Sequence, residues 1–413
     1  MDARILEPIK GGEITAPESK SHAVRIAFAS ALSGRAPDAV RGTSMDVRAA
    51  LRCSEAVREA LEGRPVQEVS SGESALTFRI LLPVMGAIGA PVTVREEGSL
   101  RSRTSKVFMD LLEAHGMRIE TRGEGLIRLT GKLSPGTYRL PGNVSSQFVT
   151  GLMFALPLLR GDSRIAIDGS LESEPYVRMT ADVLRRSGID IEEDKNGYFV
   201  KGSGNYSLPG GEVPEGDWSG ASFWIFAGAC LERGRSVTVR GLNTESLQGD
   251  RAAPDMLDRM GADIAMGVDL IIVSGGELHG IERDMSQTPD LVPAAVPAAL
   301  SANGISVMRG IRRLRLKESD RPGSIADVIA CLGGRTRGTE NSLMIPGQRL
   351  KGGEVFSFND HRIAMMTACM RVVSDGPVTV RNAEAVGKSY PEFWEDYAAL
   401  GGKLEFTDED TGY

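Results

Sequence analysis

Apolar residues recur along the chain in a pattern that predicts a helix ending at a glycine, followed by a short strand. Each clear copy of the pattern starts with Asp and ends with Gly. The clear copies are residues 110–116, 182–188, 255–261 and 327–333. A glycine just after a helix takes the left-handed backbone conformation without a steric penalty. The segments after three of these copies alternate between apolar and polar residues, as strands do. We therefore predict strands at residues 117–120, 189–192 and 262–265.

The copies are evenly spaced. Their four terminal glycines are separated by 72, 73 and 72 residues. A weaker copy ends at Gly402, 69 residues after Gly333, and a degenerate copy ends at Gly63, only 53 residues before Gly116. A period near 70 is longer than that of common solenoid repeats and has room for more than one helix and strand. The spacing predicts about six α/β repeats in a compact, pseudo-symmetric protein.

Two stretches rich in Pro and Gly, residues 7–19 and 207–217, predict linkers. They divide the chain into a middle lobe, residues 14–212, and an outer lobe formed by residues 1–13 and 213–413, with three repeats in each. Because the chain crosses between the lobes twice, we expect a hinge. A hinge lets an enzyme close over its substrate and expel water.

Composition narrows the possible partners. The 413 residues are 41% apolar, 25% charged and only 5% aromatic, with a net charge of −7. Few aromatics and a negative charge argue against binding to nucleic acid or to an anionic membrane surface. A small polyanionic substrate remains possible if cations are concentrated locally. The most apolar stretches, residues 148–159 and 221–231, are too short to span a bilayer.

The cysteines predict neither a zinc site nor a disulfide framework. The four of them lie far apart with no paired spacing, so we expect reduced, buried thiols. The first residues, 1–11, lack the apolar core of a signal peptide, and the expected location is the cytoplasm.

Charged residues are densest at residues 312–321. Residues 312–316 alternate between basic and apolar side chains and predict a strand, and Lys317, Glu318, Asp320 and Arg321 follow at once. A strand end that delivers acids and bases together can hold a charged substrate and move its protons. The alternative is a solvated turn, which is how most short charge runs end up.

Several predicted helices of the middle lobe begin with hydroxyl, amide or cationic residues. Ser19, Lys20 and Ser21 precede a helix that carries Arg25, and residues 71–79 resemble a tight turn that feeds a helix. Helix starts of this kind bind anions, and hydroxyls beside an amide can grip a phosphate and a sugar-like ring. The further candidates of this lobe are Ser145, Ser146, Gln147, Ser173, Tyr176, Arg101 and Arg103. Simple helix caps are the alternative at each start.

The outer lobe repeats the arrangement. Asp290 precedes a helix rich in Pro and Ala, residues 359–362 read Asn-Asp-His-Arg before an apolar helix, and Lys388 comes just before the last helix. His361 is the histidine in the densest polar cluster. If the helix starts converge, they form a strongly cationic cleft that suits two anionic substrates.

Taken together, the Ser-Ser-Gln, Lys-Glu-Ser-Asp-Arg and Asn-Asp-His-Arg strings resemble those of the 5-enolpyruvylshikimate-3-phosphate (EPSP) synthases, a family of enolpyruvyl transferases. The resemblance runs from Gly11 to about Tyr397, with every motif in order. It implies an α/β fold of two lobes, each of three βαβαββ repeats, known as an inside-out α/β barrel. It also implies transfer of the enolpyruvyl group of phosphoenolpyruvate to the 5-hydroxyl of shikimate 3-phosphate, without metal or organic cofactor, by a monomer.

The resemblance assigns roles to individual residues. It implies that Asp290, Glu318 and Lys20 exchange protons with the substrates. The residues implied to hold shikimate 3-phosphate are Lys20, Ser21, Arg25, Ser145, Ser146, Gln147, Ser173, Tyr176, Asp290 and Lys317. Those implied to hold phosphoenolpyruvate or its phosphate are Lys20, Ala75, Arg103, Gln147, Arg321, Arg362 and Lys388.

The chain departs from the family pattern at a few positions. Ala75-Leu76 stands where the family usually has Gly-Thr, and a methyl at this point should crowd the phosphoenolpyruvate site. Family members with Ala there are often insensitive to glyphosate, so we expect weak inhibition. Thr104 replaces a usual Pro, and Arg178 stands where Asp is common.

Two alternatives remain open. The UDP-N-acetylglucosamine enolpyruvyl transferases share the fold but usually carry a reactive Cys in the middle lobe, whereas no Cys lies between Cys53 and Cys230 here. A non-catalytic repeat protein that binds anions would have lost its acid and base positions, yet Asp290, Glu318 and Lys20 are all present.

Overall fold

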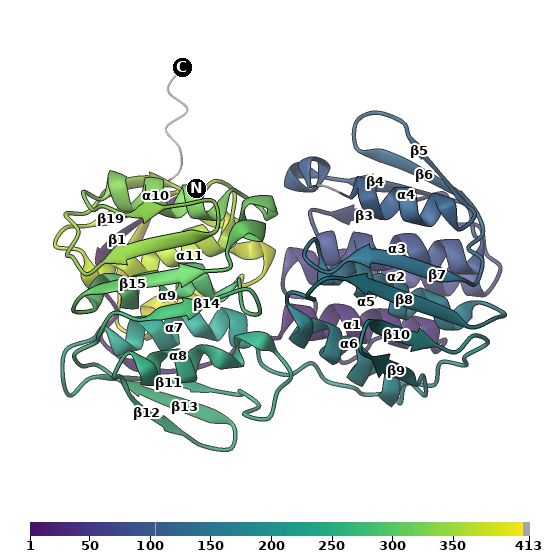
Figure 1. The fold of residues 1–413 in the computed structure, drawn as a ribbon. Helices are drawn as coiled ribbons and strands as arrows, with labels where there is room; N and C mark the ends of the chain where they lie inside the picture. The colour runs from purple at the N-terminus through teal and green to yellow at the C-terminus, as the bar shows by residue number, and fades with distance from the viewer. Residues whose placement is uncertain (104, 408–413) are drawn as a thin grey trace. The chain divides into compact units, whose positions relative to one another are not determined.

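The computed structural model describes residues 1–103 and 105–407, so Thr104 lies outside the described residues. The chain forms two compact units (Figure 1). Unit 1 contains residues 1–19 and the chain from Glu215 onward, and unit 2 contains residues 20–214. Residues 14–19, which we assigned to the middle lobe, thus belong to unit 1. The reason is that the strand at residues 12–15 pairs with a strand of unit 1.

Unit 2 is built from short helices and strands in alternation. Its helices are α1 (Lys20–Leu32), α2 (Met45–Leu61), α3 (Ala75–Ile88), η1 (Gly98–Ser102), α4 (Lys106–Ala114), α5 (Ser146–Ala155), η2 (Leu156–Leu158) and α6 (Glu174–Arg186), where η marks a 3-10 helix. Its strands are β3 (Glu68–Gly72), β4 (Val92–Glu96), β5 (Met117–Thr121), β6 (Leu126–Gly131), β7 (Thr137–Pro141), β8 (Ser163–Asp168), β9 (Ile191–Asp194) and β10 (Gly197–Val200).

Unit 1 follows the same plan. Its helices are α7 (Trp218–Ala229), η3 (Gly249–Ala252), α8 (Ala253–Arg259), α9 (Leu291–Ser301), η4 (Arg312–Leu316), α10 (Arg321–Cys331), α11 (His361–Cys369), η5 (Met370–Val373), η6 (Ala383–Lys388) and α12 (Phe393–Ala399). Its strands are β1 (Asp2–Glu7), β2 (Gly12–Thr15), β11 (Ser236–Arg240), β12 (Asp263–Met266), β13 (Leu270–Ser274), β14 (Glu282–Asp284), β15 (Ile305–Arg309), β16 (Arg337–Gly338), β17 (Ser342–Pro346), β18 (Gly353–Phe356), β19 (Val378–Arg381) and β20 (Lys403–Thr407).

Among the residues that the structure describes, five four-stranded sheets repeat one pairing pattern, in which a parallel pair is extended by two antiparallel strands. Unit 2 has the orders β3-β4-β6-β5 and β7-β8-β10-β9. Unit 1 has the orders β2-β11-β13-β12, β14-β15-β17-β16 and β18-β19-β1-β20. The common pattern confirms repeats of one kind.

The first repeat of unit 2 is incomplete. Within the described ranges it contributes the helices α1 and α2 but no four-stranded sheet. The prediction of three full repeats in the middle lobe therefore needs a correction. The short spacing between Gly63 and Gly116 explains it, because the segment between α2 and β3 is too short for a further hairpin.

The predicted glycine ends of the helices are confirmed. Gly116, Gly188, Gly261 and Gly333 all have positive φ, between 77° and 105°. At the last copy the left-handed glycine is Gly401 (φ 82°), one residue before the one we predicted. The strand predicted at 189–192 begins two residues later, at Ile191. Residues 7–19, predicted as a linker, contain strand β2.

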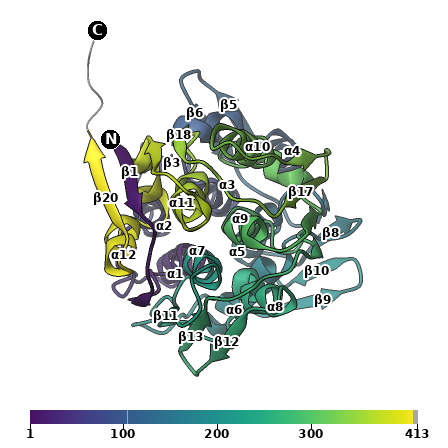
Figure 2. The ribbon, with the colours of Figure 1, turned by 90° about the vertical axis from the view of Figure 1, so that its left-hand side faces the viewer.

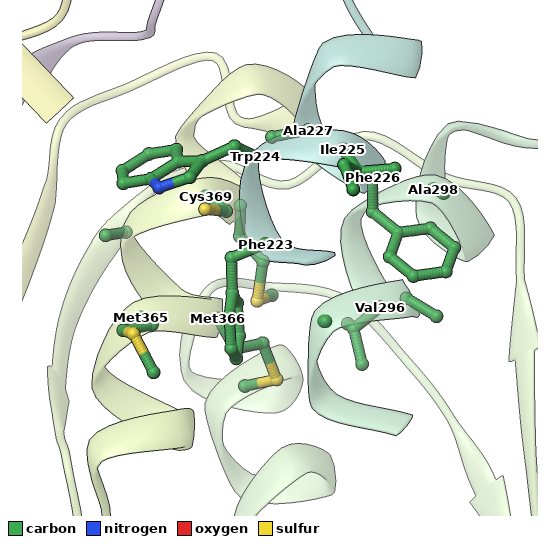
Figure 3. Packing of buried hydrophobic residues seen from close by; sticks show 14 of the residues in the cluster. Phe223, Trp224, Ile225, Phe226, Ala227, Val296, Ala298, Met365, Met366 and Cys369 are labelled. Carbon is green, nitrogen blue, oxygen red and sulfur yellow. The ribbon is translucent and has the colours of Figure 1, made fainter. Parts of the chain in front are cut away.

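Helices form the centre of each unit and sheets cover them. In unit 1, α7, α9 and α11 lie at the centre, with strands around them (Figure 2). The residues of α7 and α11 are all buried, and those of α9 almost all. Figure 3 shows side chains of these three helices meeting in one core, with Phe223 beside Met366. Helices that are apolar on all sides belong in a core. In unit 2, α1, α3 and α5 take this place. Polar groups of such helices can therefore reach a ligand only at the helix ends.

None of the helices in the described ranges combines the length and apolar character that a membrane crossing needs. The four cysteines are free, and only Cys53 and Cys369 are buried, so the expected burial of all four thiols was wrong for Cys230 and Cys331.

Candidate active site

Arg321 is the centre of a cluster of carboxylates in unit 1. Its side chain is only 1% exposed, because it is the first residue of α10 and turns inward. Its guanidinium donates to Asp360 Oδ2 at 2.8 Å, to Asp290 Oδ1 at 2.7 Å and to Glu318 Oε2 at 2.7 Å. A planar guanidinium can hold several carboxylates at fixed angles, as a lysine cannot. The predicted residues Asp290, Glu318 and Arg321 are thus brought together.

Asp290 also meets two further predicted cations. Lys317 Nζ lies 3.3 Å from its Oδ1, and Arg362 Nη2 lies 3.6 Å from its Oδ2. Burial alone would raise the pKa of Asp290, but Arg362, Lys317 and Arg321 outweigh it and hold that pKa well below its usual range. The carboxylate is therefore ionised and can accept a proton only from a strongly activated group.

Burial and the neighbouring acids also shift the pKa values of Lys317 and Arg321. Burial lowers the pKa of Lys317, although Asp290 opposes the change. Burial would also lower the pKa of Arg321, but Asp360, Glu318 and Asp290 raise it above its ordinary value. Arg321 is thus a permanent positive charge.

A strained turn carries the Asn-Asp-His-Arg string. Phe358 and Asn359 have φ of 55° and 53°, which non-glycine residues rarely adopt. The turn aims the Asn359 carbonyl at Lys388, whose Nζ donates to it at 2.7 Å. Asp360 caps α11 by accepting from the backbone N–H of Arg362 at 2.9 Å. Backbone strain of this kind is common at functional sites.

The structure decides two predictions for residues 312–321. Residues 312–316 form the 3-10 helix η4, not a strand. The strand is the preceding segment β15, and Gly310 (φ 71°) ends it before the basic residues begin. The alternative of a solvated turn at 317–321 is excluded for Arg321 by its burial.

Asp250 is a polar residue of this unit that sequence reasoning missed. It is fully buried in η3 and accepts a hydrogen bond from the Ser219 hydroxyl. Burial raises its pKa to about 6, with Asp290 adding to the effect and Arg362 opposing it. A single Asp before an Arg gives no signal in the sequence. Asp217, by contrast, is a simple helix cap, since it accepts from the backbone N–H of Ser219 at the start of α7.

Unit 2 gathers its candidates at the starts of α1, α3, α5 and α6. Lys20 is the first residue of α1, and its Nζ lies 3.0 Å from Asp46 Oδ2. Arg25, 1% exposed, donates to the carbonyls of Ser21 at 2.6 Å and Tyr176 at 2.9 Å, and to the Thr180 hydroxyl at 2.9 Å. Burial lowers the pKa of Arg25 to about 10. Arg25 therefore ties together two other predicted residues, Ser21 and Tyr176.

Arg79 organises the start of α5. It donates from Nη1 to Ser145 Oγ at 3.2 Å and to Gln147 Oε1 at 2.8 Å, and it lies 4.9 Å from the centre of the Phe148 ring. Ser145 is also the N-cap of this helix. Our assignment did not include Arg79. The available signal was an arginine inside the otherwise apolar segment 75–88.

The remaining candidates also lie at ends of helices. Ala75 starts α3 and is 5% exposed, and Arg103 directly follows η1. Ser173 precedes α6 with φ of 55°, and Ser146 begins α5. Arg178, one of the departures from the family pattern, is exposed and bound to Glu174 at 2.6 Å.

Together, the two units hold all the predicted site residues at or near helix ends. The set in unit 2 is mainly cationic and hydroxylic, and the set in unit 1 combines four cations with two acids. Cations and hydroxyls suit carboxylates and phosphates. In the part of the chain that the structure describes, no three or more His, Cys, Asp or Glu side chains are grouped to hold a metal ion.

Comparison with known proteins agrees with this chemistry. The sequence model of the family described as EPSP synthase (3-phosphoshikimate 1-carboxyvinyltransferase) matches residues 6–397. The 3-phosphoshikimate 1-carboxyvinyltransferase of Clostridium kluyveri is 40% identical over 336 residues, which cover 81% of this chain and 78% of that protein. The protein of the same name from Clostridioides difficile is 31% identical over 95% of this chain and 96% of its own length.

Solved structures show the fold. The EPSP synthase from Acinetobacter baumannii superposes with a TM-score of 0.76 at 22% identity, covering 98% of this chain and all of that one. The enolpyruvyl transferase NikO from Streptomyces tendae reaches 0.74 at 18% identity, with 98% of each chain covered. The fold is therefore the two-lobed inside-out α/β barrel. With a family match over nearly the whole chain, this protein belongs to the EPSP synthase family of transferases.

Proposed function

We propose that this protein transfers the enolpyruvyl group of phosphoenolpyruvate to the 5-hydroxyl of shikimate 3-phosphate and releases phosphate, a step toward the aromatic amino acids. The observation that carries the proposal is the binding of Asp290 and Glu318 to one buried arginine, Arg321. The cluster provides two acids for proton transfer and a permanent positive charge for anionic substrates. The chain also belongs to the family that the reaction would require. The alternative of a non-catalytic anion-binding protein leaves both acids unexplained.

The reaction is balanced without a cofactor. The 5-hydroxyl oxygen bonds to C2 of phosphoenolpyruvate and loses its proton, while C3 gains a proton. The tetrahedral intermediate then loses a proton from C3 and the phosphate from C2, which restores the double bond. Phosphoenolpyruvate thus supplies its own leaving group, and the protein has to supply proton transfer and positioning.

Asp290, Glu318 and Lys20 are proposed to move the protons. Asp290 is ionised in its cationic setting and can accept the hydroxyl proton as C2 becomes electrophilic. Anionic substrates bound nearby would offset its cations and make it a stronger base. Glu318 and Lys20 are proposed to exchange protons with C3 and with the departing phosphate.

The shikimate 3-phosphate residues are proposed as Ser21, Arg25, Ser145, Ser146, Gln147, Ser173 and Tyr176, with Lys20, Asp290 and Lys317. The hydroxyl and amide groups at the starts of α5 and α6 support this, because they suit a phosphate and a polyol ring. Arg25 donates to the backbone of Ser21 and Tyr176, so we propose that it acts by holding them in place.

The phosphoenolpyruvate residues are proposed as Lys20, Ala75, Arg103, Gln147, Arg321, Arg362 and Lys388. Arginine forks suit its carboxylate and phosphate groups. The methyl of Ala75 lies at the start of α3, so we propose that it crowds this ligand and weakens inhibition by glyphosate.

The test is phosphate release by the purified protein. We expect release from phosphoenolpyruvate only when shikimate 3-phosphate is added, with a stoichiometric enolpyruvyl product. UDP-N-acetylglucosamine should not replace shikimate 3-phosphate. Release with the nucleotide sugar, or none with either acceptor, would overturn the proposal.

We also propose that the protein is a cytoplasmic monomer. Its free thiols are compatible with a reducing compartment. Light scattering coupled to size exclusion should give the mass of one chain, 44.2 kDa.

A further inference from the structure

Glu73 is an acid at the helix start that carries Ala75, and the reaction as proposed does not use it. Its Oε2 accepts two hydrogen bonds from Ser99, one from the backbone N–H at 2.9 Å and one from the hydroxyl at 2.8 Å. Ser99 belongs to η1, the short helix that ends just before Arg103.

The glycine before Ser99 fits the carboxylate closely. Gly98 has φ of 47°, and a Cβ on it would lie 2.4 Å from the carboxyl carbon of Glu73 and within 2.7 Å of both oxygens. Such distances are far below van der Waals contact. The backbone at the start of η1 therefore makes room for the Glu73 carboxylate.

Backbone hydrogen bonds extend this contact to Arg103. The N–H of Leu100 donates to the carbonyl of Glu97 at 3.1 Å, and the N–H of Arg103 donates to the carbonyl of Leu100 at 3.0 Å. On the other side, the N–H of Glu97 donates to the carbonyl of Gly72 at 2.9 Å. The η1 segment is thus attached at two points to the turn that leads into α3.

We propose that Glu73 is a positioning residue that fixes η1, and through it Arg103, relative to the start of α3. The inference deepens the proposed function and rests on it, since Arg103 is proposed to hold phosphoenolpyruvate. One carboxylate then sets the spacing between the residue that clamps this substrate, Arg103, and the residue that crowds it, Ala75. Affinity for phosphoenolpyruvate depends on that spacing, whereas affinity for shikimate 3-phosphate does not.

Steady-state kinetics of Glu73→Ala, Glu73→Gln and Ser99→Ala test the proposal. Loss of a charge-assisted hydrogen-bond pair should raise the KM for phosphoenolpyruvate about tenfold in Glu73→Ala. The kcat and the KM for shikimate 3-phosphate should change by less than about twofold. The reason is that the variant loses binding energy for phosphoenolpyruvate equally in the ground state and the transition state. Glu73→Gln keeps an acceptor oxygen and should stay within about threefold of wild type. Ser99→Ala keeps the backbone bond, and its KM for phosphoenolpyruvate should lie between those of wild type and Glu73→Ala, about threefold above wild type.

Glu68→Ala is the matched control. Glu68 is an exposed acid of the neighbouring strand β3 and is bound to Arg95 at 2.9 Å. Its loss should leave both KM values unchanged. An unchanged KM for phosphoenolpyruvate in both Glu73→Ala and Ser99→Ala would overturn the inference and leave the proposed function intact. Equal changes in both KM values, together with a lower Tm, would assign Glu73 a general structural role instead. Inactive wild-type protein would remove the proposed function and this inference with it.

Discussion

Arg321 satisfies three carboxylates with one guanidinium while its side chain is 1% exposed. Burying such a group is costly unless every charge is paired and hydrogen-bonded. The acids of the cluster are therefore held at fixed positions before any substrate arrives. Fixed acids are what a proton-transfer step requires, because the geometry of the donor and acceptor limits the rate.

Glu318→Gln separates the acid function of this cluster from its geometry. The amide oxygen can still accept from Arg321 Nη2, which Glu318 now binds at 2.7 Å. We expect kcat to fall by about 100-fold or more, with a small change in the KM for phosphoenolpyruvate. The exposed Glu340→Gln, which affects a surface pair with Arg312, should be neutral. Nearly unchanged turnover in Glu318→Gln would refute a proton-transfer role.

Ala75→Gly tests the crowding of the phosphoenolpyruvate site. Removing the methyl should increase sensitivity to glyphosate, with an inhibition constant lower by about tenfold or more, since one well-placed methyl is worth about 1–3 kcal/mol in a tight pocket. The measurement is an inhibition curve against phosphoenolpyruvate for both proteins. If sensitivity does not increase, Ala75 does not set the response to this inhibitor.

Motif residues could be predicted from the sequence, but their supporting residues could not. Asp290, Glu318 and Arg321 stood out because short strings of acids and bases carry a signal. Asp250 carries none, and Arg79 is marked only as an arginine in a mostly apolar segment, because the groups that they touch are distant in sequence: Ser219 for Asp250, and Gln147 for Arg79. Arg25 was predicted as a site residue, and this stays a prediction, but its contacts with backbone carbonyls could not be foreseen.

At the scale of elements, α3 and α5 approach each other closely through a glycine. A Cβ on Gly151 of α5 would lie 2.0 Å from the carbonyl oxygen of Arg79 in α3. We expect Gly151→Ala to lower the free energy of unfolding by about 1–3 kcal/mol, since overpacking displaces the backbone. Displacement of Arg79 should also lower kcat/KM. Chemical denaturation and kinetics check the two effects.

A matched glycine controls for the substitution itself. Gly276 has no atom within 4 Å of its added Cβ and no positive φ. Gly276→Ala should therefore change stability by less than about 0.5 kcal/mol and leave activity intact. Equal effects of the two substitutions would contradict the close approach of α3 and α5.

Helix ends were the most predictable elements, and strands the least. The glycines that end helices were identified because their left-handed conformation is a local requirement. Strand β2 was not, because it has only four residues in a Pro- and Gly-rich segment and depends on its partner β11. The wrong strand at 312–316 shows the same limit, since alternation over five residues also fits one turn and a half of 3-10 helix.

For the whole molecule, spacing predicted the repeats but not the missing sheet of the first one. Even spacing reports complete repeats, and the short interval before Gly116 indicated only that one copy was degenerate. The five sheets share one pairing pattern, and that pattern could be recognised only from the hydrogen bonds. The hinge expected from the two chain crossings stays a prediction.

The pH dependence of stability is a property of the whole molecule to which Asp250 makes a distinct contribution. Its pKa in the folded protein, about 6, is above the ordinary value of 3.8, because burial disfavours the charged form. Between these two pH values the folded state binds more protons than the unfolded state. Stability from this group is therefore present below pH 3.8 and is lost as the pH rises through 6. The contribution of Asp290 to stability depends on pH in the opposite direction, because its pKa is lowered in the folded protein. This contribution is lost only in strong acid, as the pH falls toward that low pKa.

Asp250→Asn should remove the cost of ionising this group. The amide oxygen can accept from the Ser219 hydroxyl as the carboxylate does. At pH 8 we expect the variant to be more stable than wild type by roughly 3 kcal/mol, and at pH 4 the difference should nearly vanish. Urea denaturation at a series of pH values measures it. A difference that is constant across pH would show that Asp250 does not titrate in this range, and a variant less stable at pH 8 would show that the ionised carboxylate is stabilised by Arg362 after all.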